Sequence, residues 1–255
     1  MSILKSILPE KLYHSLRKNY QRFKLKHIPA DDKYQEKSHS EIFSEIYDNG
    51  LWAQGKEAKY LETDAKYYSG SGSYNKSSLE YIQFITEYIK ANNITSITDI
   101  GCGDFNIGSQ ICDQNPHIAY NGVDVVPNMI RHHNEKFGSE RISFYCLNTL
   151  TDKIPPADLL VIRQVLQHLS NGDITRLTNN CFSGFRHILV TEHQPKPEYL
   201  IKENIEKSSG PNTRVGSMTG SGVYLNKAPF TYKWQCLLTA EDDNPRTQIN
   251  TYKIV

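Results

Sequence analysis

The residues that decide the fold are Thr98-Asp99-Ile100-Gly101-Cys102-Gly103-Asp104-Phe105. A β-branched run over residues 94–100 leads into the two glycines, and a helical pattern over residues 105–113 follows them. This order predicts a buried strand, a tight turn and a helix. In open α/β sheets ligands bind beyond the carboxyl ends of the strands, so the glycine turn marks a candidate binding site.

Strand and helix patterns alternate downstream of this turn. Further strands are expected over residues 117–125, 142–147, 158–163 and 187–191, with helices over 127–137 and about 171–182. Alternation of this kind predicts an α/β fold, in which a parallel sheet carries helices on its faces. Two last strands are expected over residues 232–239 and 247–255, on either side of a turn at 241–245.

Residues 194–230 carry little periodicity, although one helix is expected near residues 198–206. A connection this long is uncommon inside a compact domain and is often a lid or a binding loop. Disorder is the alternative interpretation. We expect the segment to be a substrate-side insertion in a domain that spans residues 94–255.

The N-terminal part of the chain has a different pattern. Residues 1–28 contain seven Lys or Arg and one Glu, with apolar side chains three or four residues apart, which predicts a basic amphipathic helix. Such a helix either packs on the body of the protein or lies on an anionic membrane surface. A linker reaches to about residue 40. Residues 41–93 are expected to form a cap with a helix at 41–47, a Ser/Gly loop, and a second helix that Ser77 and Glu80 begin as a capping box.

The composition excludes several classes of protein. The net charge of +1, from 29 Lys and Arg against 28 Asp and Glu, argues against charge-driven binding of nucleic acid. No apolar run is long enough to cross a bilayer, and no secretory segment follows Met1. Five cysteines without CxxC spacing match neither a disulfide framework nor a zinc site. We expect a cytoplasmic protein, with contact to the inner face of the membrane as the alternative for residues 1–28. The oligomeric state stays unknown from sequence.

The polar residues around the turn restrict the ligand. A dinucleotide fingerprint would have a third glycine at position 106, where this chain has Asn106. Asp99, just before the glycines, disfavours a pyrophosphate and suits a cationic group such as the ammonium of an amino acid. Asp124 follows the glycines by about 20 residues, where an acid binds ribose hydroxyls. S-adenosylmethionine carries an amino-acid end, a ribose and an adenine, so it fits both carboxylates.

At this point the chain resembles a known family. Asp99-Ile100-Gly101-Cys102-Gly103 is similar to the first motif of class I S-adenosylmethionine-dependent methyltransferases, and Asp124 to their second. One subgroup, associated with surface-glycan and other sugar-modifying pathways, is resembled further by residues 46–47, Trp52 and residues 69–73, 78–80, 103–106, 122–127 and 166–170. The resemblance implies a Rossmann-like fold, with a mostly parallel seven-stranded sheet that ends in an antiparallel hairpin.

The resemblance also implies an activity. It indicates an enzyme of polysaccharide biosynthesis that transfers a methyl group from S-adenosylmethionine to an oxygen of a sugar or sugar-linked acceptor, with S-adenosylhomocysteine as the product. No nucleic-acid partner is expected. The alternatives are a methyltransferase that acts on a small metabolite, a protein or RNA, and a non-catalytic scaffold protein that binds S-adenosylmethionine.

By the same resemblance, ten residues are expected to bind the cofactor: Asp99, Gly101, Cys102, Gly103, Asp124, Val125, Leu147, Asn148, Arg163 and Gln164. The glycine turn would pass beneath the methionine part, Asp124 would bind the ribose, and Val125 would contact the adenine. Asn148 stands where the family often has an acid that reaches the adenine amino group. Arg163 and Gln164 would lie beside the sulfonium.

The catalytic candidates are His168, Glu192 and His193, which follow the fourth and fifth strands on the expected ligand edge. An alcohol acceptor has to lose its proton, and a histidine that titrates near neutrality suits a general base. For His168 the alternative is a hydrogen bond to the backbone at the start of a helix. No metal is expected; a divalent cation held by these three residues is the alternative.

Four residues are expected to bind the acceptor: Trp52, Tyr68, Ser71 and Ser73. They belong to the aromatic and Ser/Gly-rich part of the cap, between residues 47 and 73. Aromatic side chains there would either stack on a sugar or cover the cofactor.

Overall fold

A seven-stranded sheet forms the centre of the protein, which is seen in a computed structural model that describes residues 9, 12, 15, 16, 32–34, 36–53, 66–215 and 220–255. The strand order is β3-β2-β1-β4-β5-β7-β6. The strands are β1 (Ser96–Ile100), β2 (Ala119–Asp124), β3 (Ile142–Cys146), β4 (Leu159–Arg163), β5 (His187–Pro195), β6 (Trp234–Glu241) and β7 (Thr247–Ile254). Neighbours among β1 to β5 pair in parallel, whereas β7 pairs antiparallel with β5 and β6.

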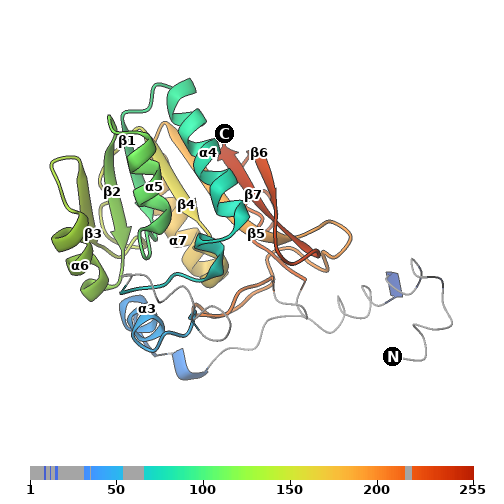
Figure 1. Ribbon diagram of the computed structural model, residues 1–255. Coiled ribbons are helices and arrows are strands. Elements are labelled where there is room, and N and C mark those ends of the chain that lie inside the picture. Colours follow the sequence, from blue (N-terminus) through green and yellow to red (C-terminus); the bar gives the residue numbers. More distant parts are fainter. Residues whose placement is uncertain are drawn as a thin grey trace.

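Helices lie on both faces of the sheet (Figure 1). The described α-helices are α3 (His39–Asp48), α4 (Lys76–Ala91), α5 (Asn106–Gln114), α6 (Pro127–Phe137) and α7 (Asn171–Cys181); the short 3-10 turns are η1 (Asp32–Tyr34), η3 (Ser71–Ser73), η4 (Leu166–His168) and η5 (Phe182–Gly184). In Figure 1, α4 and α5 lie in front of the sheet and α7 lies behind it, while α3 lies below the carboxyl ends of the strands.

Strand β4 shows how the sequence pattern builds this three-layer core. Leu159 and Val161 pack with the apolar side chains of α4 and α5, and Leu160 and Ile162 pack with those of α7. All four are buried, because successive side chains of a strand point to opposite faces and both faces are covered. The continuous apolar run of β4 is therefore the expected signature of a central parallel strand.

The sheet also creates a crevice. β1 lies between β2 and β4, so that Asp99 is paired with Gly122 on one side and Val161 on the other. From β1 the chain crosses to β2, whereas β4 is reached only after β3 on the far edge. At such a topological switch point the loops beyond the carboxyl ends of the strands diverge and leave room for a ligand.

The predicted strands and helices of the sheet domain are confirmed, and so is the fold class. One helix prediction is wrong: residues 198–206 contain turns and one isolated bridge. Asn204 there has a left-handed backbone, with φ of 49°. Its side-chain amide donates to the carbonyl oxygens of Tyr224, Lys227 and Ala228. Long-range contacts thus fix this segment, and helical periodicity does not.

The start of α4 also differs from the prediction. Asn75 caps the helix, since its side-chain oxygen accepts a hydrogen bond from the amide of Ser78 at 3.2 Å. The Ser77 hydroxyl donates to the same oxygen at 2.7 Å. Ser77 therefore lies inside the helix and supports its cap.

The expected basic helix at residues 1–28 lies outside the described residues except for Pro9, Leu12, Ser15 and Leu16. Among the helices that the structure does describe, none combines the length and the apolar character needed to cross a membrane.

Candidate active site

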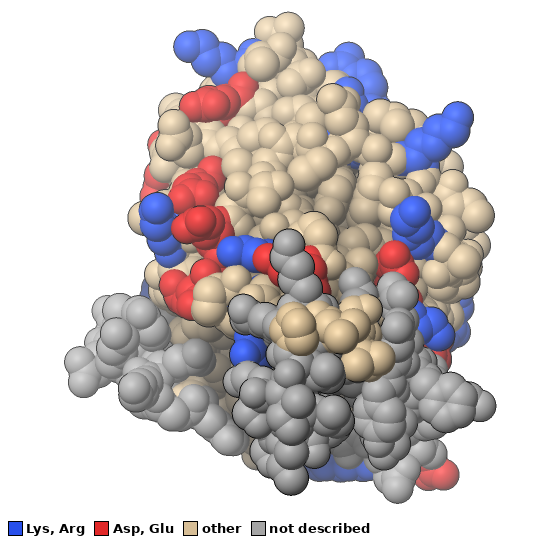
Figure 2. Space-filling view, turned by 90° about the vertical axis from the view of Figure 1, so that its right-hand side faces the viewer, with Lys and Arg blue, Asp and Glu red and all other residues tan. Residues whose placement is uncertain are grey.

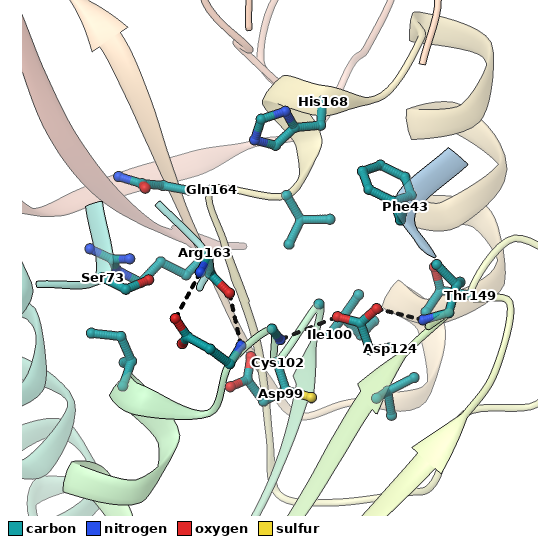
Figure 3. A pocket seen from close by; sticks show the side chains of 18 of the residues that line it. Phe43, Ser73, Asp99, Ile100, Cys102, Asp124, Thr149, Arg163, Gln164 and His168 are labelled. Atoms are coloured by element: carbon teal, nitrogen blue, oxygen red, sulfur yellow. Dashed lines mark hydrogen bonds between the residues drawn. The ribbon is translucent and has the colours of Figure 1, made fainter. Parts of the chain in front are cut away.

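A pocket opens at the carboxyl edge of β1, β2 and β4, with about 1140 Å³ of space between its walls, mouth included. Twelve residues that the sequence predicted as site residues line it: Trp52, Ser73, Asp99, Gly101, Cys102, Gly103, Asp124, Val125, Asn148, Arg163, Gln164 and His168. Figure 3 shows that Asp99 and Asp124 on one side and His168 on the other border one common space. A concave site at this edge of an open α/β sheet is the usual place for a small-molecule ligand.

The floor of the pocket is the turn between β1 and α5. Gly101 and Gly103 have φ of 72° and 55°, a left-handed backbone that favours glycine. A Cβ atom on Gly101 would lie 2.3 Å from a methyl of Val165, and one on Gly103 would lie 2.3 Å from the Ser69 hydroxyl. Both positions therefore require glycine for conformation and for space.

The backbone amides of this turn are all used within the protein. Those of Gly101 and Cys102 donate to the Val123 carbonyl, at 2.8 and 3.2 Å, and that of Phe105 donates to the Cys102 carbonyl at 3.1 Å. Side chains accept from the other three: Asp124 from Gly103, Ser69 from Asp104, and Asp104 from Asn106, at 3.2, 2.8 and 3.1 Å. A phosphate binds at a helix start through free amides, so this turn does not suit a pyrophosphate.

Carboxylates take the place that amides have in a phosphate site. Asp124, at the end of β2, is buried; its Oδ1 accepts from the amides of Val125 and Val126, at 2.7 and 3.3 Å, and its Oδ2 from Gly103. Burial raises the pKa of Asp124 to about 6. The carboxylate is fixed in orientation and lines the pocket, so it can accept further hydrogen bonds from a ligand.

Asp99, at the end of β1, is the second buried carboxylate. Its Oδ2 accepts a hydrogen bond from the Tyr120 hydroxyl at 2.6 Å. Burial raises the pKa of Asp99 to about 7, and this hydrogen bond and the positive charge of Arg163 lower it. A cationic partner stabilises the ionised form of such a buried acid, because its charge compensates for the solvation that the carboxylate has lost.

The opposite wall is η4, which follows β4. The backbone amides of Leu166 and Gln167 donate to the two carboxylate oxygens of Glu192, at 2.9 and 3.1 Å. The carbonyl of His168 accepts from the Lys207 ammonium at 2.9 Å. The His168 ring lies 5.0 Å from the Trp52 ring, centroid to centroid. Burial, and next the charge of Lys207, lower the pKa of His168 to about 3, so its imidazole is neutral at pH 7.

Comparisons with known proteins agree with this geometry. A family described as "Methyltransferase domain" matches residues 98–186. Daphnetin O-methyltransferase 1 of Secale cereale is 26% identical over 141 residues, which cover 55% of this chain and 38% of that protein. The N-methyltransferase NodS from Bradyrhizobium japonicum WM9, solved with S-adenosylhomocysteine, superposes with a TM-score of 0.52 at 14% identity, over 82% of this chain and 98% of that one.

Residues 98–186 thus match a methyltransferase domain family, and the fold is the Rossmann-like fold of class I methyltransferases. The mitomycin 7-O-methyltransferase MmcR shares the fold, with a TM-score of 0.51 and 13% identity over 97% of this chain and 69% of that one. At such identities the structural likeness concerns the fold. The chain spans 38% of the length of the curated daphnetin O-methyltransferase that it matches.

Five predicted site residues of the methyltransferase domain and its cap lie outside the pocket lining: Tyr68, Ser71, Leu147, Glu192 and His193. Tyr68 stacks on Tyr74, with ring centroids 5.2 Å apart, and Ser71 begins η3 on the surface. Leu147 continues β3 through a backbone hydrogen bond to the carbonyl of Asp124.

The catalytic roles expected for Glu192 and His193 do not fit their places. Glu192 is buried behind η4, where its two oxygens are occupied by backbone amides. His193 lies further along β5 and contacts the carboxylate of Asp242 at 3.0 Å. Both were expected to follow the fifth strand, but β5 runs on to Pro195, so these residues pair with β7 inside the sheet.

Several other residues line the pocket of the methyltransferase domain and were not predicted as site residues. Phe43 and Tyr47 come from α3, and Ser69 and Asp104 come from the contact between the cap and the glycine turn. The hydroxyls of Tyr47 and Ser69 form a hydrogen bond at 2.8 Å, and the Asp104 carboxylate accepts one from the Ser69 amide at 2.8 Å. A helix was predicted at residues 41–47, but no sequence signal showed that α3 covers the carboxyl edge of the sheet.

No group of three or more His, Cys, Asp or Glu in the described part of the chain is arranged to hold a metal ion. His133 is buried in α6, where its Nε2 contacts the Gly103 carbonyl at 2.7 Å. Because a carbonyl only accepts, Nε2 carries the proton. His133 thus supports the glycine turn from below.

Proposed function

We propose that the protein is a methyltransferase that binds S-adenosylmethionine in this pocket and transfers its methyl group to an oxygen of a small acceptor. The observation that carries the proposal is the glycine turn, whose six amides are internally satisfied while two buried carboxylates, Asp99 and Asp124, line the cavity beside it. A ligand with a cationic amino-acid end and a ribose fits this arrangement, because the two carboxylates can accept hydrogen bonds from an ammonium group and from hydroxyls.

In this proposal each wall of the pocket binds a part of the cofactor. Asp124 would accept hydrogen bonds from the ribose hydroxyls, the glycine turn would lie under the methionine chain, and Val125, Asn148 and Leu150 would border the adenine. The cofactor supplies an electrophilic methyl group when it is bound. The protein then has to hold the acceptor oxygen in line with that methyl group.

The acceptor side would be the space between α3 and η4. Phe43 and Trp52 form an apolar wall there, and His168 is a polar residue that faces it. The neutral His168 ring has a lone pair with which it can accept a hydrogen bond from an acceptor hydroxyl. A base with so low a pKa takes the proton only as positive charge builds up on the oxygen during transfer.

We keep a sugar or sugar-linked hydroxyl, a step in polysaccharide biosynthesis, as the proposed acceptor. The motif resemblance supports it, and Trp52 offers a flat face on which a sugar can stack. An aromatic hydroxyl compound is the second candidate, because the wall of Phe43 and Trp52 suits a planar ring and the relatives include O-methyltransferases of daphnetin and mitomycin. The face of the molecule that carries β6 and β7 mixes Lys and Arg with Asp and Glu (Figure 2), so it attracts no polyanion such as RNA.

The test has two stages. Calorimetric titration with S-adenosylhomocysteine shows whether the pocket binds the cofactor product. Transfer of label from S-adenosylmethionine to a panel of sugar nucleotides, lipid-linked sugars and phenols then identifies the acceptor. Labelled sugars support the first candidate and labelled phenols the second. Binding without transfer to any acceptor would favour a scaffold protein, and absence of binding by folded protein would refute the proposal.

The affinity for S-adenosylhomocysteine should fall as the pH decreases from 8 to 5. With pKa values of about 7 for Asp99 and about 6 for Asp124 in the free protein, protons compete with the ligand below these values. The loss can reach about tenfold per pH unit for each group that has to ionise. Titration calorimetry at several pH values, in buffers of different ionisation enthalpy, should also show that binding releases protons. Affinity that is constant over this range would contradict the assigned roles.

Replacing His168 by phenylalanine should lower the rate of methyl transfer by about 100-fold, the lower range for loss of a general base. The phenyl ring keeps the contact with Trp52 but has no lone pair. His168→Gln, whose amide oxygen can take the place of Nε2, should retain more activity. The affinity for S-adenosylhomocysteine should stay within about twofold in both variants. A rate in His168→Phe equal to that of the wild type would exclude His168 as the base.

A further inference from the structure

Arg163 is the last residue of β4, and its guanidinium makes few of the hydrogen bonds that it could donate. Its Nη2 donates to the Gly72 carbonyl at 2.7 Å, and its guanidinium lies over the Tyr81 ring, 5.2 Å from the centroid. Its Nε is buried, and among the described residues it has no hydrogen-bond partner. A guanidinium has five N–H groups, so most of its capacity to donate is unused.

The nearby carboxylates do not neutralise this cation by direct contact. Asp99, Asp104 and Glu192 all act on Arg163 through their charge, but no ion pair within 4.0 Å joins it to an acid in the part of the chain that the structure describes. Asp104 is occupied by Ser69, Tyr74 and Asn106, and Glu192 by the amides of η4. Burying a cation without full hydrogen bonding is unfavourable, so the site gains free energy from an incoming anion.

The position of Arg163 indicates the end of the pocket at which such an anion would bind. Arg163 lines the pocket on the same side as Ser73, and Asp99 lies below it at the end of the neighbouring strand (Figure 3). A partly buried cation and a buried anion thus face the same end of the cavity, next to the glycine turn. Such a pair is complementary to a zwitterion, in which a carboxylate and an ammonium group are attached to one carbon atom.

We propose that Arg163 binds the carboxylate of the amino-acid end of the cofactor, while Asp99 binds its ammonium group. The inference rests on the proposed function and adds a role to Arg163 that differs from a place beside the sulfonium. Gly72 and the Tyr81 ring hold two sides of the guanidinium, so the remaining N–H groups have a fixed direction. Arg163 is then a residue that selects ligands with an intact amino-acid end.

The test compares two ligands by titration calorimetry. S-adenosylhomocysteine carries the amino-acid end, and 5′-methylthioadenosine carries the same adenine and ribose without it. Arg163→Met should weaken the binding of S-adenosylhomocysteine by about 10- to 100-fold, as expected for a lost charge-assisted hydrogen bond. It should leave the binding of 5′-methylthioadenosine within about twofold. Arg163→Lys, which keeps the charge without the planar fork, should fall between the wild type and Arg163→Met.

Matched variants separate the possible outcomes. Asp124→Ala should weaken both ligands, because both carry the ribose, and 5′-methylthioadenosine binding by Arg163→Met shows that this variant has folded. Equal losses for both ligands in Arg163→Met, or no loss for either, would overturn the inference and leave the proposed function intact. Wild-type protein that binds neither ligand would overturn the proposed function and this inference together.

Discussion

Asp124→Ala is expected to bind S-adenosylhomocysteine at least about 100-fold more weakly than the wild type. The carboxylate of Asp124 is held by three backbone amides and lines the pocket, so it needs no rearrangement to accept the two ribose hydroxyls. Each hydrogen bond to a charged acceptor contributes about 1.5–3 kcal/mol, and two of them exceed a factor of 100 in affinity. Titration calorimetry measures the change directly.

Asp124→Asn is the matched control for this variant. It keeps the shape of the side chain and one accepting oxygen, but it removes the charge that makes the hydrogen bonds strong. We expect its affinity to lie between those of the alanine variant and the wild type. Far-ultraviolet circular dichroism should show that both variants are folded, since loss of a buried charge removes a desolvation penalty as well as contacts. Wild-type affinity in folded Asp124→Ala would remove Asp124 from the cofactor site.

Arg214→Met is expected to destabilise the protein by about 3–5 kcal/mol, the usual loss when one partner of a buried charged network is removed. Arg214 is fully buried in the segment after β5. It donates to the carbonyls of Ile205, Leu166 and Gln167 and to the side chain of Asn171, at 3.0, 3.1, 3.4 and 2.9 Å. The variant removes these four hydrogen bonds and takes from Glu192 the larger of two nearby positive charges, that of Arg214, while the charge of Arg163 stays.

Thermal denaturation should show a Tm roughly 10 °C below that of the wild type, at about 2–4 °C for each kcal/mol. The double variant Glu192→Gln with Arg214→Met tests the mechanism, because it removes the buried negative charge as well. If the two charges stabilise each other, the double variant loses less stability than the two single variants together. Strictly additive losses would show that Arg214 acts through its hydrogen bonds to the carbonyls alone.

The sequence predicts the sheet because its strands are buried on both faces. The continuous apolar run Leu159–Ile162 is typical of a strand that is covered on both faces, and all four residues are buried. The glycine turn after β1 identifies the edge of the sheet at which the pocket lies. The helix predicted near residues 198–206 does not form. Their backbone is held by Asn204, Lys207 and Arg214 in contacts with distant parts of the chain, and such contacts leave no periodic trace.

Nine of the ten residues predicted for the cofactor line the pocket, whereas of the seven predicted for the acceptor and for catalysis only Trp52, Ser73 and His168 do. Asp99 and Asp124 stand at strand ends, whose places follow from the topology. Glu192 lies behind η4 because the backbone amides of η4 donate hydrogen bonds to its carboxylate. These contacts form only in the folded chain, so the local sequence does not show on which side of η4 Glu192 lies. The contribution of Phe43 likewise depends on how α3 docks, which local sequence does not encode.

The hydrogen bonds of the glycine-turn amides restrict which substitutions this site can accept during evolution. Their partners come from three separate parts of the chain: Ser69 before the sheet, the turn itself, and Val123 with Asp124 at the end of β2. The space for a side chain at position 103 is already filled by the Ser69 hydroxyl. A substitution at position 103 is therefore compatible with the turn only if position 69 changes with it. Over evolutionary time these distant positions should vary as one unit, and a graft of the turn into another protein has to bring all three parts.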